Sequence, residues 1–372
     1  MKLMFVVTHL AYGGAETQVV ELCSHFVRKG WEVSLVSLMT PSGLTDRLDA
    51  LGVPWSTLGL RRGQYAPRLV TGLARFIRRQ RPDVVHSHTL PANFAARAAR
   101  LLSRPPVLVT SAHNLTEGGR AKMLYYRVTD RLADLTTNCS ESAVERYIRI
   151  KAAPADRIRY MPNGIDTERF HPDEQVRAES RRAHVPDDGF LWLAVARMTE
   201  QKDWPNMFAA CERALRPQDR LLVVGNGELE DDVRRWVAER GLQDRVVLLG
   251  TRTDIPELMR TADAYVMSSA WEGLPIVLLE ASASGLPIVA TDVGGNHQLV
   301  QHDRTGWLVP AKDPSALAEA MTRMATAPPA QRAAMGAAAR AHVEDGYSIT
   351  AVAREWEEIY LQLLQQKTGR AA

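Results

Sequence analysis

Short apolar runs alternate with amphipathic segments along the first half of the chain. Strands are expected at residues 3–8, 31–38, 53–58, 83–87, 107–111, 135–138 and 158–161. The stronger runs are continuously apolar, which is typical of parallel strands buried on both faces. Apolar residues at helical spacing predict helices at residues 15–29, 68–81, 91–102 and 121–133. This regular alternation predicts a doubly wound α/β sheet.

A second series of the same kind starts at residue 190. Its strands are expected at residues 190–196, 220–225, 245–249, 264–267, 287–290 and 306–309. Residues 162–188 are polar and turn-rich, so we interpret them as the linker. An amphipathic helix at 349–366 ends the chain. A length of 372 residues is enough for two full cores. We therefore expect domains at residues 1–165 and 166–348, followed by residues 349–372.

Charge is unevenly divided between the two halves. Residues 1–170 hold 24 Lys and Arg against 14 Asp and Glu, whereas the remainder holds 22 against 29. The predicted helix at 68–81 carries Arg68, Arg75, Arg78, Arg79 and Arg81 on its polar face. This excess suggests an anionic acceptor or an anionic membrane surface as partner; a solvated helix face is the alternative. We expect no nucleic acid partner.

Cysteine usage and hydropathy indicate the compartment. Cys23, Cys139 and Cys211 are far apart and form no CxxC pair, which fits a reducing compartment. The first residues are too soon interrupted for a signal peptide, so we expect a strand there. No run approaches the roughly 20 apolar residues of a spanning helix. We expect a cytoplasmic protein, soluble or peripheral on the inner face of the cell membrane.

The stretch from Glu272 to Glu280 carries the strongest chemical signal. It follows the strand predicted at 264–267, and Pro275 suits the first position of the next helix. Glu272 should then stand at the carboxyl end of a strand, and Glu280 about two turns along the helix. Carboxylates accept from sugar hydroxyls, and a helix N-terminus suits phosphate. The pattern fits a sugar nucleotide; a solvated Glu and a helix-face Glu are the alternative.

Two cations follow the first strand of the second series. Arg197 and Lys202 flank residues 198–201, where a strand should end. Such a pair can hold a diphosphate and stabilise it as a leaving group without a metal ion. The alternative is two surface cations.

Glycine-rich turns recur after the predicted strands. Gly13 and Gly14 follow the first strand, and a phosphate could approach their backbone N–H groups. Asn226 and Arg252 lie in two further turns, at residues 224–228 and 250–254, and residues 291–296 form another. A tight turn explains each of these segments equally well. For Gly13 and Gly14 the alternative is a tight turn that needs positive φ.

Several histidines lie near strand ends. His113 ends a strand of the first half and could hydrogen-bond a sugar hydroxyl. For His9, His86 and His88 we favour structural or surface roles. The sequence has no HExxH motif and no carboxylate–histidine spacing that would converge on a metal ion, so no metal site is predicted.

The ordered set of motifs resembles the family-4 retaining glycosyltransferases of GT-B fold. The resemblance rests on the E-x7-E stretch from Glu272 to Glu280 and on residues 195–202. It also rests on residues 224–227, residues 162–166, Gly13-Gly14 and Gly294-Gly295. It covers nearly the whole chain. One departure is visible at His297-Gln298, where the family often carries an acid.

The resemblance implies two facing Rossmann-like domains and a last helix that crosses back to the first. Arg197 and Lys202 would hold the donor diphosphate, while Glu280 would bind the ribose. Glu272 would contact the transferred sugar, beside the turn of Gly273 and Leu274. His113 would lie by the donor sugar, and Gly13 and Gly14 would approach the diphosphate and acceptor. Asn226 and Arg252 complete the expected donor site.

The implied reaction moves a hexose-type sugar from a UDP- or GDP-sugar, with retention of configuration and no required metal or cofactor. The expected acceptor is a glycan or a polyprenyl-diphosphate-linked sugar in cell-surface polysaccharide assembly. Epimerases and phosphorylases of the same architecture stay open, as does a non-catalytic sugar-nucleotide binder. A nicotinamide dehydrogenase is disfavoured, because neither half has GxGxxG with an acid about twenty residues on.

Overall fold

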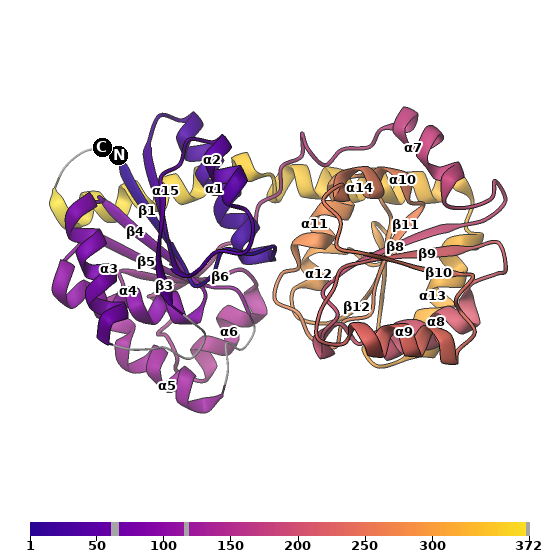
Figure 1. Cartoon of the computed structure of the whole chain (residues 1–372), viewed down its shortest axis with the longest axis horizontal. Coiled ribbons are helices and arrows are strands. Elements are labelled where there is room, and N and C mark those ends of the chain that lie inside the picture. The colour runs from indigo at the N-terminus through magenta and orange to yellow at the C-terminus, as the bar shows by residue number, and fades with distance from the viewer. Residues whose placement is uncertain (61–66, 115–118, 370–372) are drawn as a thin grey trace. The chain divides into compact units, whose positions relative to one another are not determined.

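The computed structural model describes residues 1–60, 67–114 and 119–369, except for the side chains of Pro67 and Arg120. The chain divides into two compact units (Figure 1). Unit 1 comprises residues 1–164 and 349–372, and unit 2 comprises residues 165–348. Each unit is a parallel sheet covered by helices, so the predicted α/β class with two Rossmann-like domains is confirmed.

The sheet of unit 1 has the order β3-β2-β1-β4-β5-β6-β7, and every neighbouring pair is parallel. Its strands are β1 Lys2–Val7, β2 Glu32–Met39, β3 Trp55–Leu60, β4 Val84–His88, β5 Val107–Ala112, β6 Leu135–Asn138 and β7 Ile158–Tyr160. Alternate residues of β1 enter different cores: Phe5 lies in one and Met4 in the other. Burial on both faces explains the unbroken apolar run.

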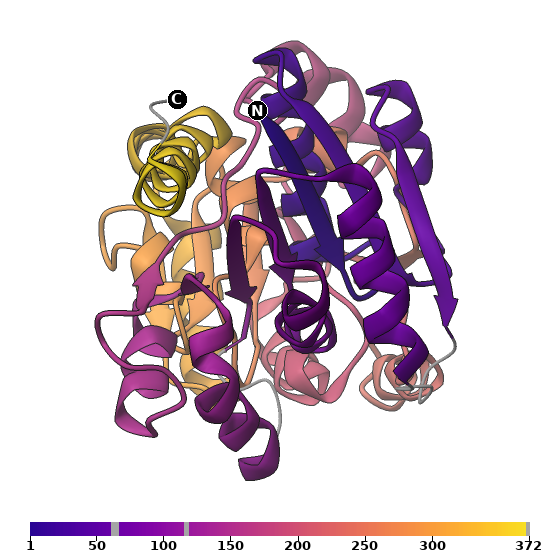
Figure 2. The ribbon, with the colours of Figure 1, turned by 90° about the vertical axis from the view of Figure 1, so that its left-hand side faces the viewer.

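Helices cover both faces of this sheet. They are α1 Gly14–Arg28, α2 Thr45–Ala50, α3 Pro67–Gln80, α4 Leu90–Ser103, α5 Arg120–Thr129, α6 Glu141–Arg149 and α15 Ile349–Thr368. Helices α3 and α4 pack on one core, while α1 and α15 share the other. Trp356 and Tyr360 of α15 are buried there, so the expected return of the last helix to the first domain is confirmed (Figure 2).

The sheet of unit 2 has the order β10-β9-β8-β11-β12-β13 and is also parallel. Its strands are β8 Leu191–Val195, β9 Arg220–Val224, β10 Val246–Gly250, β11 Ala264–Met267, β12 Ile288–Thr291 and β13 Gly306–Val309. Its helices are α7 Glu174–Ser180, α8 Trp204–Ala214, α9 Glu230–Glu239, α10 Ile255–Thr261, α11 Ile276–Ala283, α12 Asn296–Leu299, α13 Pro314–Thr326 and α14 Pro329–Gly346. Trp192, Trp204 and Trp307 are fully buried in its core.

Three local predictions need correction. The segment interpreted as a linker contains α7, which Asp173 caps through Gln175 and Val176. No residue of α7 is buried, so it has no apolar periodicity to detect. The helix expected at 121–133 ends as an α-helix at Thr129 and continues as a 3₁₀ turn to Leu132. Pro275 is the N-cap of α11 rather than its first residue.

Strand order reverses at one place in each sheet. In unit 1 this switch point lies between β1 and β4, and in unit 2 between β8 and β11. The connections that follow the two strands at a switch point run to opposite faces of the sheet, and a crevice is expected between them at the carboxyl ends of the strands. The Gly13-Gly14 loop follows β1, the Arg197–Lys202 segment follows β8, and Glu272 follows β11. The topology thus places the strongest candidates at switch points.

Candidate donor and reaction site

Glu272 and Lys202 meet at the switch point of unit 2. The Lys202 ammonium Nζ lies 2.5 Å from Glu272 Oε1. The amide of Gln201 donates to the other carboxylate oxygen, Oε2, at 3.0 Å. Only 6% of the Glu272 side chain and 15% of the Lys202 side chain are exposed. The carboxylate is therefore buried with both oxygens engaged and its charge compensated.

Backbone contacts hold the two loops of this pair together. The Gln201 amide also donates to the carbonyl of Trp271 at 2.9 Å, and the Ala270 N–H donates to the carbonyl of Gln201 at 2.8 Å. The Ser268 hydroxyl donates to the carbonyl of Lys202 at 2.8 Å. These bonds tie the backbone on either side of the ion pair together.

Gly294 and Gly295 pack directly against the Glu272 loop. Gly294 has φ +56°, and a Cβ there would lie 2.1 Å from the carbonyl oxygen of Glu272. The Gly295 N–H donates to the carbonyl of Gly273 at 2.7 Å. Both the left-handed backbone and the close approach require glycine at 294. The loop after β12 thus packs against the Glu272 loop and supports it.

Close backbone approach also explains the glycines around Asn226. Gly225 has φ +136°, and a Cβ there would lie 2.0 Å from the carbonyl oxygen of Ala196. The Met198 N–H donates to the carbonyl of Asn226 at 2.7 Å. This turn therefore fixes the segment that carries Arg197, while the Asn226 side chain is exposed.

Glu280 and Glu272 act on the same buried side chain. Tyr265 of β11 donates its hydroxyl to the carbonyl of Val195 at 3.0 Å. Burial raises the pKa of Tyr265, and the negative charges of Glu280 and Glu272 raise it further. Glu280 lies on α11 and is half-buried. Both carboxylates thus lie within electrostatic reach of the β8–β11 crevice.

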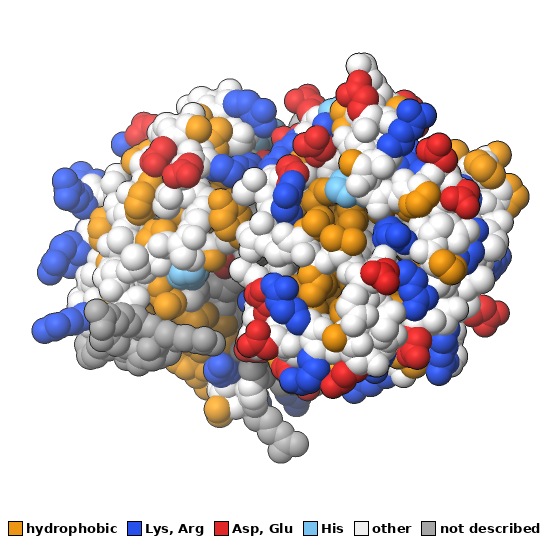
Figure 3. All heavy atoms as spheres, turned by 45° about the vertical axis from the view of Figure 1, so that its right-hand side comes forward, with side chains coloured by type: hydrophobic (Ala, Val, Ile, Leu, Met, Phe, Trp, Pro, Cys, Tyr) orange, Lys and Arg blue, Asp and Glu red, His pale blue; other side chains and the backbone are white. Residues whose placement is uncertain are grey.

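The two arginines differ in their surroundings. Arg197 is exposed and makes no ion pair with any residue the structure describes. Arg252 is exposed too, but its guanidinium binds Asp254 through Nε–Oδ1 at 2.8 Å and Nη2–Oδ2 at 2.5 Å. Figure 3 shows Lys, Arg, Asp and Glu side chains interspersed on the face of unit 2 that it presents. The structure brings Lys202 to Glu272 but ties Arg252 to its own loop.

In unit 1, Gly13 is the N-cap of α1 and Gly14 is its first residue. Gly13 has φ −158°, and neither glycine lies in the left-handed region. The alternative of a turn that needs positive φ is therefore wrong. A Cβ on Gly13 would lie 2.5 Å from Oε2 of Glu16, the end of a flexible side chain.

His113 follows β5 and contacts a second histidine. Its Nε2 lies 2.9 Å from Nδ1 of His88, and the Cys139 thiol donates to its carbonyl at 3.4 Å. Burial lowers the pKa of His113 to about 4. The pKa of His88 is held well below its ordinary value by burial and then by its histidine neighbours. Both rings are therefore neutral at neutral pH.

The other two histidines predicted near strand ends, His86 and His9, have different partners. His86 bonds the Tyr360 hydroxyl through Nδ1 at 2.6 Å and the Ser111 hydroxyl through Nε2 at 2.7 Å. Both of its ring nitrogens are therefore engaged within unit 1, which is consistent with the structural role expected for it. His9 lies 3.5 Å from the Ser42 hydroxyl. No group of three His, Cys, Asp or Glu side chains that could hold a metal ion is found among the residues described.

Three contributors were missed from the sequence. Gln201 binds Glu272, His88 binds His113, and Gln18 lines the same cavity as the two histidines. Gln201 could have been found by its place between Arg197 and Lys202. His88 could have been found as the residue that ends β4 beside β5, since Ser111 is its register partner. Nothing local indicates Gln18.

Comparisons with known proteins agree with this architecture. Residues 12–169 match the family model described as glycosyltransferase family 4, and residues 176–342 match glycosyl transferases group 1. The chain is 34% identical over 303 residues to D-inositol 3-phosphate glycosyltransferase of Pseudarthrobacter chlorophenolicus, covering 74% of this chain and 71% of the relative. It is 29% identical over 267 residues to the UDP-Gal:alpha-D-GlcNAc-diphosphoundecaprenol alpha-1,3-galactosyltransferase of Escherichia coli, covering 68% of each.

Solved structures show the same fold. Anabaena Alr3699/HepE in complex with UDP and glucose superposes with a TM-score of 0.87 at 22% identity, covering 96% of this chain and 99% of that one. These findings define a transferase enzyme of GT-B fold, a glycosyltransferase. Within that class the chain belongs to the family-4 glycosyltransferases, with a group 1 second half.

Proposed function

We propose that this enzyme transfers a hexose-type sugar from a UDP- or GDP-sugar to a glycan or polyprenyl-diphosphate-linked acceptor. The transfer retains the anomeric configuration and serves cell-surface polysaccharide assembly. Two relatives support the donor class by name: one uses UDP-Gal and another is GDP-mannose-dependent. The acceptor of the first is a diphosphoundecaprenol-linked sugar, and that of the second is a phosphatidylinositol monomannoside.

The observation that carries the proposal is the Lys202–Glu272 pair with Arg197 nearby in the sequence. The diphosphate would take Arg197 and the ammonium of Lys202, whose charges stabilise it as it leaves. Glu272 would accept from the transferred sugar beside the backbone of Gly273 and Leu274. Glu280 would accept from the ribose hydroxyls, and Asn226 and Arg252 would approach the nucleotide. In this arrangement protein cations neutralise the leaving group, so no metal ion is required.

Retention follows from a same-face mechanism without a protein nucleophile. Glu272 accepts bonds from Lys202 on Oε1 and from Gln201 on Oε2, which lowers its nucleophilicity. The bond from the anomeric carbon to the leaving phosphate oxygen breaks, and the acceptor oxygen bonds to the same face. The acceptor proton passes to that phosphate oxygen. His113 would contact the donor sugar, and Gly13 and Gly14 would approach the diphosphate and acceptor.

Unit 1 offers surfaces for the acceptor. An open pocket of about 500 Å³ is lined by the aromatic rings of Tyr12 and Trp55, by hydroxyl side chains such as Thr40 and Ser42, and by Asp46. Aromatic faces with hydroxyl and carboxylate groups suit a sugar.

The arginine-bearing helix α3 supports peripheral attachment to the inner face of the cell membrane. Its Leu69, Leu73 and Ile77 are buried, while Arg75, Arg78 and Arg79 are exposed. Basic side chains on an amphipathic helix attract anionic lipid surfaces. In the part of the chain that is described, no helix combines the length and apolarity needed to cross a bilayer.

A donor panel tests the proposal. Unfolding temperature is measured with UDP-, GDP- and ADP-sugars, first in EDTA and then with Mg²⁺. A saturating donor at a hundredfold excess over Kd stabilises the fold by about 2.7 kcal/mol. We expect one nucleotide family to raise the unfolding temperature without metal, and Lys202→Ala to abolish this while Lys122→Ala, an exposed site, does not. No shift with any donor would contradict the proposed site.

Product analysis then tests the reaction. The stabilising donor is incubated with polyprenyl-diphosphate-linked sugars, and the anomeric configuration of the product is read by NMR. A product with retained configuration supports the proposal. A changed sugar nucleotide formed without acceptor would indicate an epimerase, and donor binding without turnover would indicate a binding protein.

A further inference from the structure

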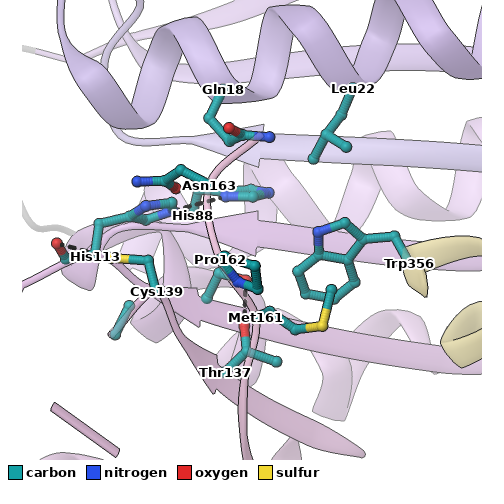
Figure 4. A pocket seen from close by; sticks show the side chains of 12 residues that line it. Gln18, Leu22, His88, His113, Thr137, Cys139, Met161, Pro162, Asn163 and Trp356 are labelled. Atoms are coloured by element: carbon teal, nitrogen blue, oxygen red, sulfur yellow. Dashed lines mark hydrogen bonds between the residues drawn. The ribbon is translucent and has the colours of Figure 1, made fainter. Parts of the chain in front are cut away.

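A small cavity with both polar and apolar lining lies inside unit 1 beside His113. Its lining includes Gln18 of α1, His88, His113 and Asn163. Its volume is about 10 Å³, the room that one buried water molecule occupies. Figure 4 shows the Gln18 amide and the rings of His88 and His113 around it, with the two rings joined.

Two buried polar atoms of this lining have no hydrogen-bond partner in the described structure: Nε2 of Gln18 and Nε2 of His88. Gln18 is 3% exposed and His88 is 1% exposed. Leaving such groups unpaired in the interior carries a desolvation penalty, so a ligand for both is expected. A single water molecule fits the volume and can bond both atoms.

The orientation of the Gln18 amide is fixed by its other contact. Its Oε1 accepts from the backbone N–H of Gly164 at 2.7 Å. Because an N–H can only donate, that atom must be the carbonyl oxygen. The Nε2 group is then a donor at the cavity, and a water molecule there accepts from it.

The same water molecule has hydrogens to donate, and Nε2 of His88 is the unpaired atom that can accept one. His88 would then carry its proton on Nδ1. That N–H donates to Nε2 of His113 across 2.9 Å, and the two rings are stacked with an interplanar angle of 29°. His113, a neutral ring, must then carry its proton on Nδ1.

We infer that Gln18 and His88, through one buried water molecule, select the tautomer of His113 that carries its proton on Nδ1. The role of this N–H toward the sugar rests on the proposed function. Gln18 and His88 act as positioning residues. A neutral ring with its proton on Nδ1 donates to a sugar oxygen and does not accept the acceptor's proton. That agrees with transfer of the acceptor's proton to the leaving phosphate.

The tautomer is measured directly by long-range ¹H–¹⁵N correlation NMR of protein labelled at the histidine rings, without substrate. His113→Asn and His88→Asn assign the two signals. In the wild type we expect the proton on Nδ1 of both rings. In Gln18→Glu the Gly164 N–H keeps its acceptor, but a donor at the cavity becomes an acceptor. We expect the proton of His88 to move to Nε2 and that of His113 to follow.

Gln18→Met removes the donor without adding an acceptor, and we expect it to give a mixture of tautomers. Gln243→Glu, an exposed site, should leave both rings unchanged. An Nε2–H tautomer of His113 in the wild type, or unchanged tautomers in both Gln18 variants, would overturn the inference. Thermal unfolding of each variant establishes that it is folded.

Kinetics separate this inference from the proposed function. With transfer established, Gln18→Glu should lower kcat about tenfold, the worth of one hydrogen bond, and Gln18→Met by less, both at unchanged affinity for the nucleoside diphosphate. If the tautomers shift as expected while kcat does not change, the control of the His113 tautomer by Gln18 and His88 stands, and the sugar contact of His113 is wrong. If no donor binds at all, the NMR result still decides whether Gln18 and His88 control the tautomer.

Discussion

Lys202 Nζ lies 2.5 Å from Glu272 Oε1, although 70 positions separate the two residues in the chain. The contact joins the loop after β8 to the loop after β11, at the point where strand order reverses. A buried ion pair is stable only when its remaining hydrogen-bonding capacity is used. Gln201 does this for the second carboxylate oxygen. The pair therefore holds the loops after β8 and β11 together at the switch point.

Removing one partner of this pair should destabilise unit 2. We expect Lys202→Met to lower the free energy of unfolding by about 3 kcal/mol, because Glu272 is left as an uncompensated buried charge. Urea titration measures the change. Lys202→Met combined with Glu272→Gln should recover most of the loss. The exposed Arg234–Glu230 pair is the control: Arg234→Met should cost under about 0.5 kcal/mol. Equal losses for the two single variants would contradict the role of burial.

Close approach at Gly294 can be separated from its backbone conformation. Gly294 has φ +56° and Gly241 has φ +60°, but only Gly294 would bring a Cβ against another backbone, that of Glu272. Gly241→Ala should cost about 1 kcal/mol for the left-handed conformation alone. Gly294→Ala should lower the free energy of unfolding by a further 2 kcal/mol or more, because an overpacked site costs roughly that amount. It should also weaken donor binding. Denaturant unfolding and donor titration check this. Similar losses at both positions would show that the approach is relieved easily.

Most of the fold could be predicted from the sequence, because parallel strands buried on both faces leave unbroken apolar runs. All thirteen predicted strands are present, with ends shifted by up to two residues. Helix α7 escaped prediction because none of its residues is buried. It is held instead by polar contacts, such as those of Arg177 and of the C-cap residue Arg181 with Asp263. Such contacts have no periodic signature.

The site was only partly predictable. Glu272 and Lys202 could be singled out because both follow strands, and strand ends converge at one sheet edge. Their mutual contact could not be predicted, since it depends on which strands are neighbours. The same holds for His88 and His113, which are brought together by the pairing of β4 with β5. Gly225 was interpreted through its local turn, whereas its neighbour across the loop, Ala196, explains it.

Acid should destabilise unit 1 through His86, His88 and His113. The pKa values of His86, His88 and His113 all lie below the ordinary value of 6.5 in the folded protein, that of His113 at about 4. The unfolded chain therefore binds more protons, so stability is full above pH 6.5 and falls as the pH decreases toward these values. Between pH 7.5 and 5.5 each histidine should cost about 1.4 kcal/mol, roughly 4 kcal/mol in total.

Urea unfolding at the two pH values measures this loss. In His86→Asn the loss between pH 7.5 and 5.5 should fall by about one third. His302→Asn, whose side chain is 54% exposed, should leave it unchanged. A loss that is the same in all three proteins would show that other groups cause the acid sensitivity.

Charge reversal on α3 tests the proposed membrane surface. Arg75, Arg78 and Arg79 are exposed, so Arg→Glu at all three leaves the core of the helix intact. Each basic side chain near an anionic surface contributes about 1 kcal/mol of attraction, so the triple variant should no longer sediment with phosphatidylglycerol vesicles. Wild-type binding should also weaken as NaCl is raised, because salt screens exposed charges.

The matched control reverses Arg213, Arg234 and Arg235, which are exposed in unit 2 and change the net charge equally. This second variant should sediment like the wild type, since the attraction is expected from α3 and not from net charge. If both triple variants lose binding to the same extent, attraction depends on net charge alone and α3 is not a docking face. If the α3 variant sediments as well as the wild type, the arginines form a solvated helix face, and the acceptor must be reached without them.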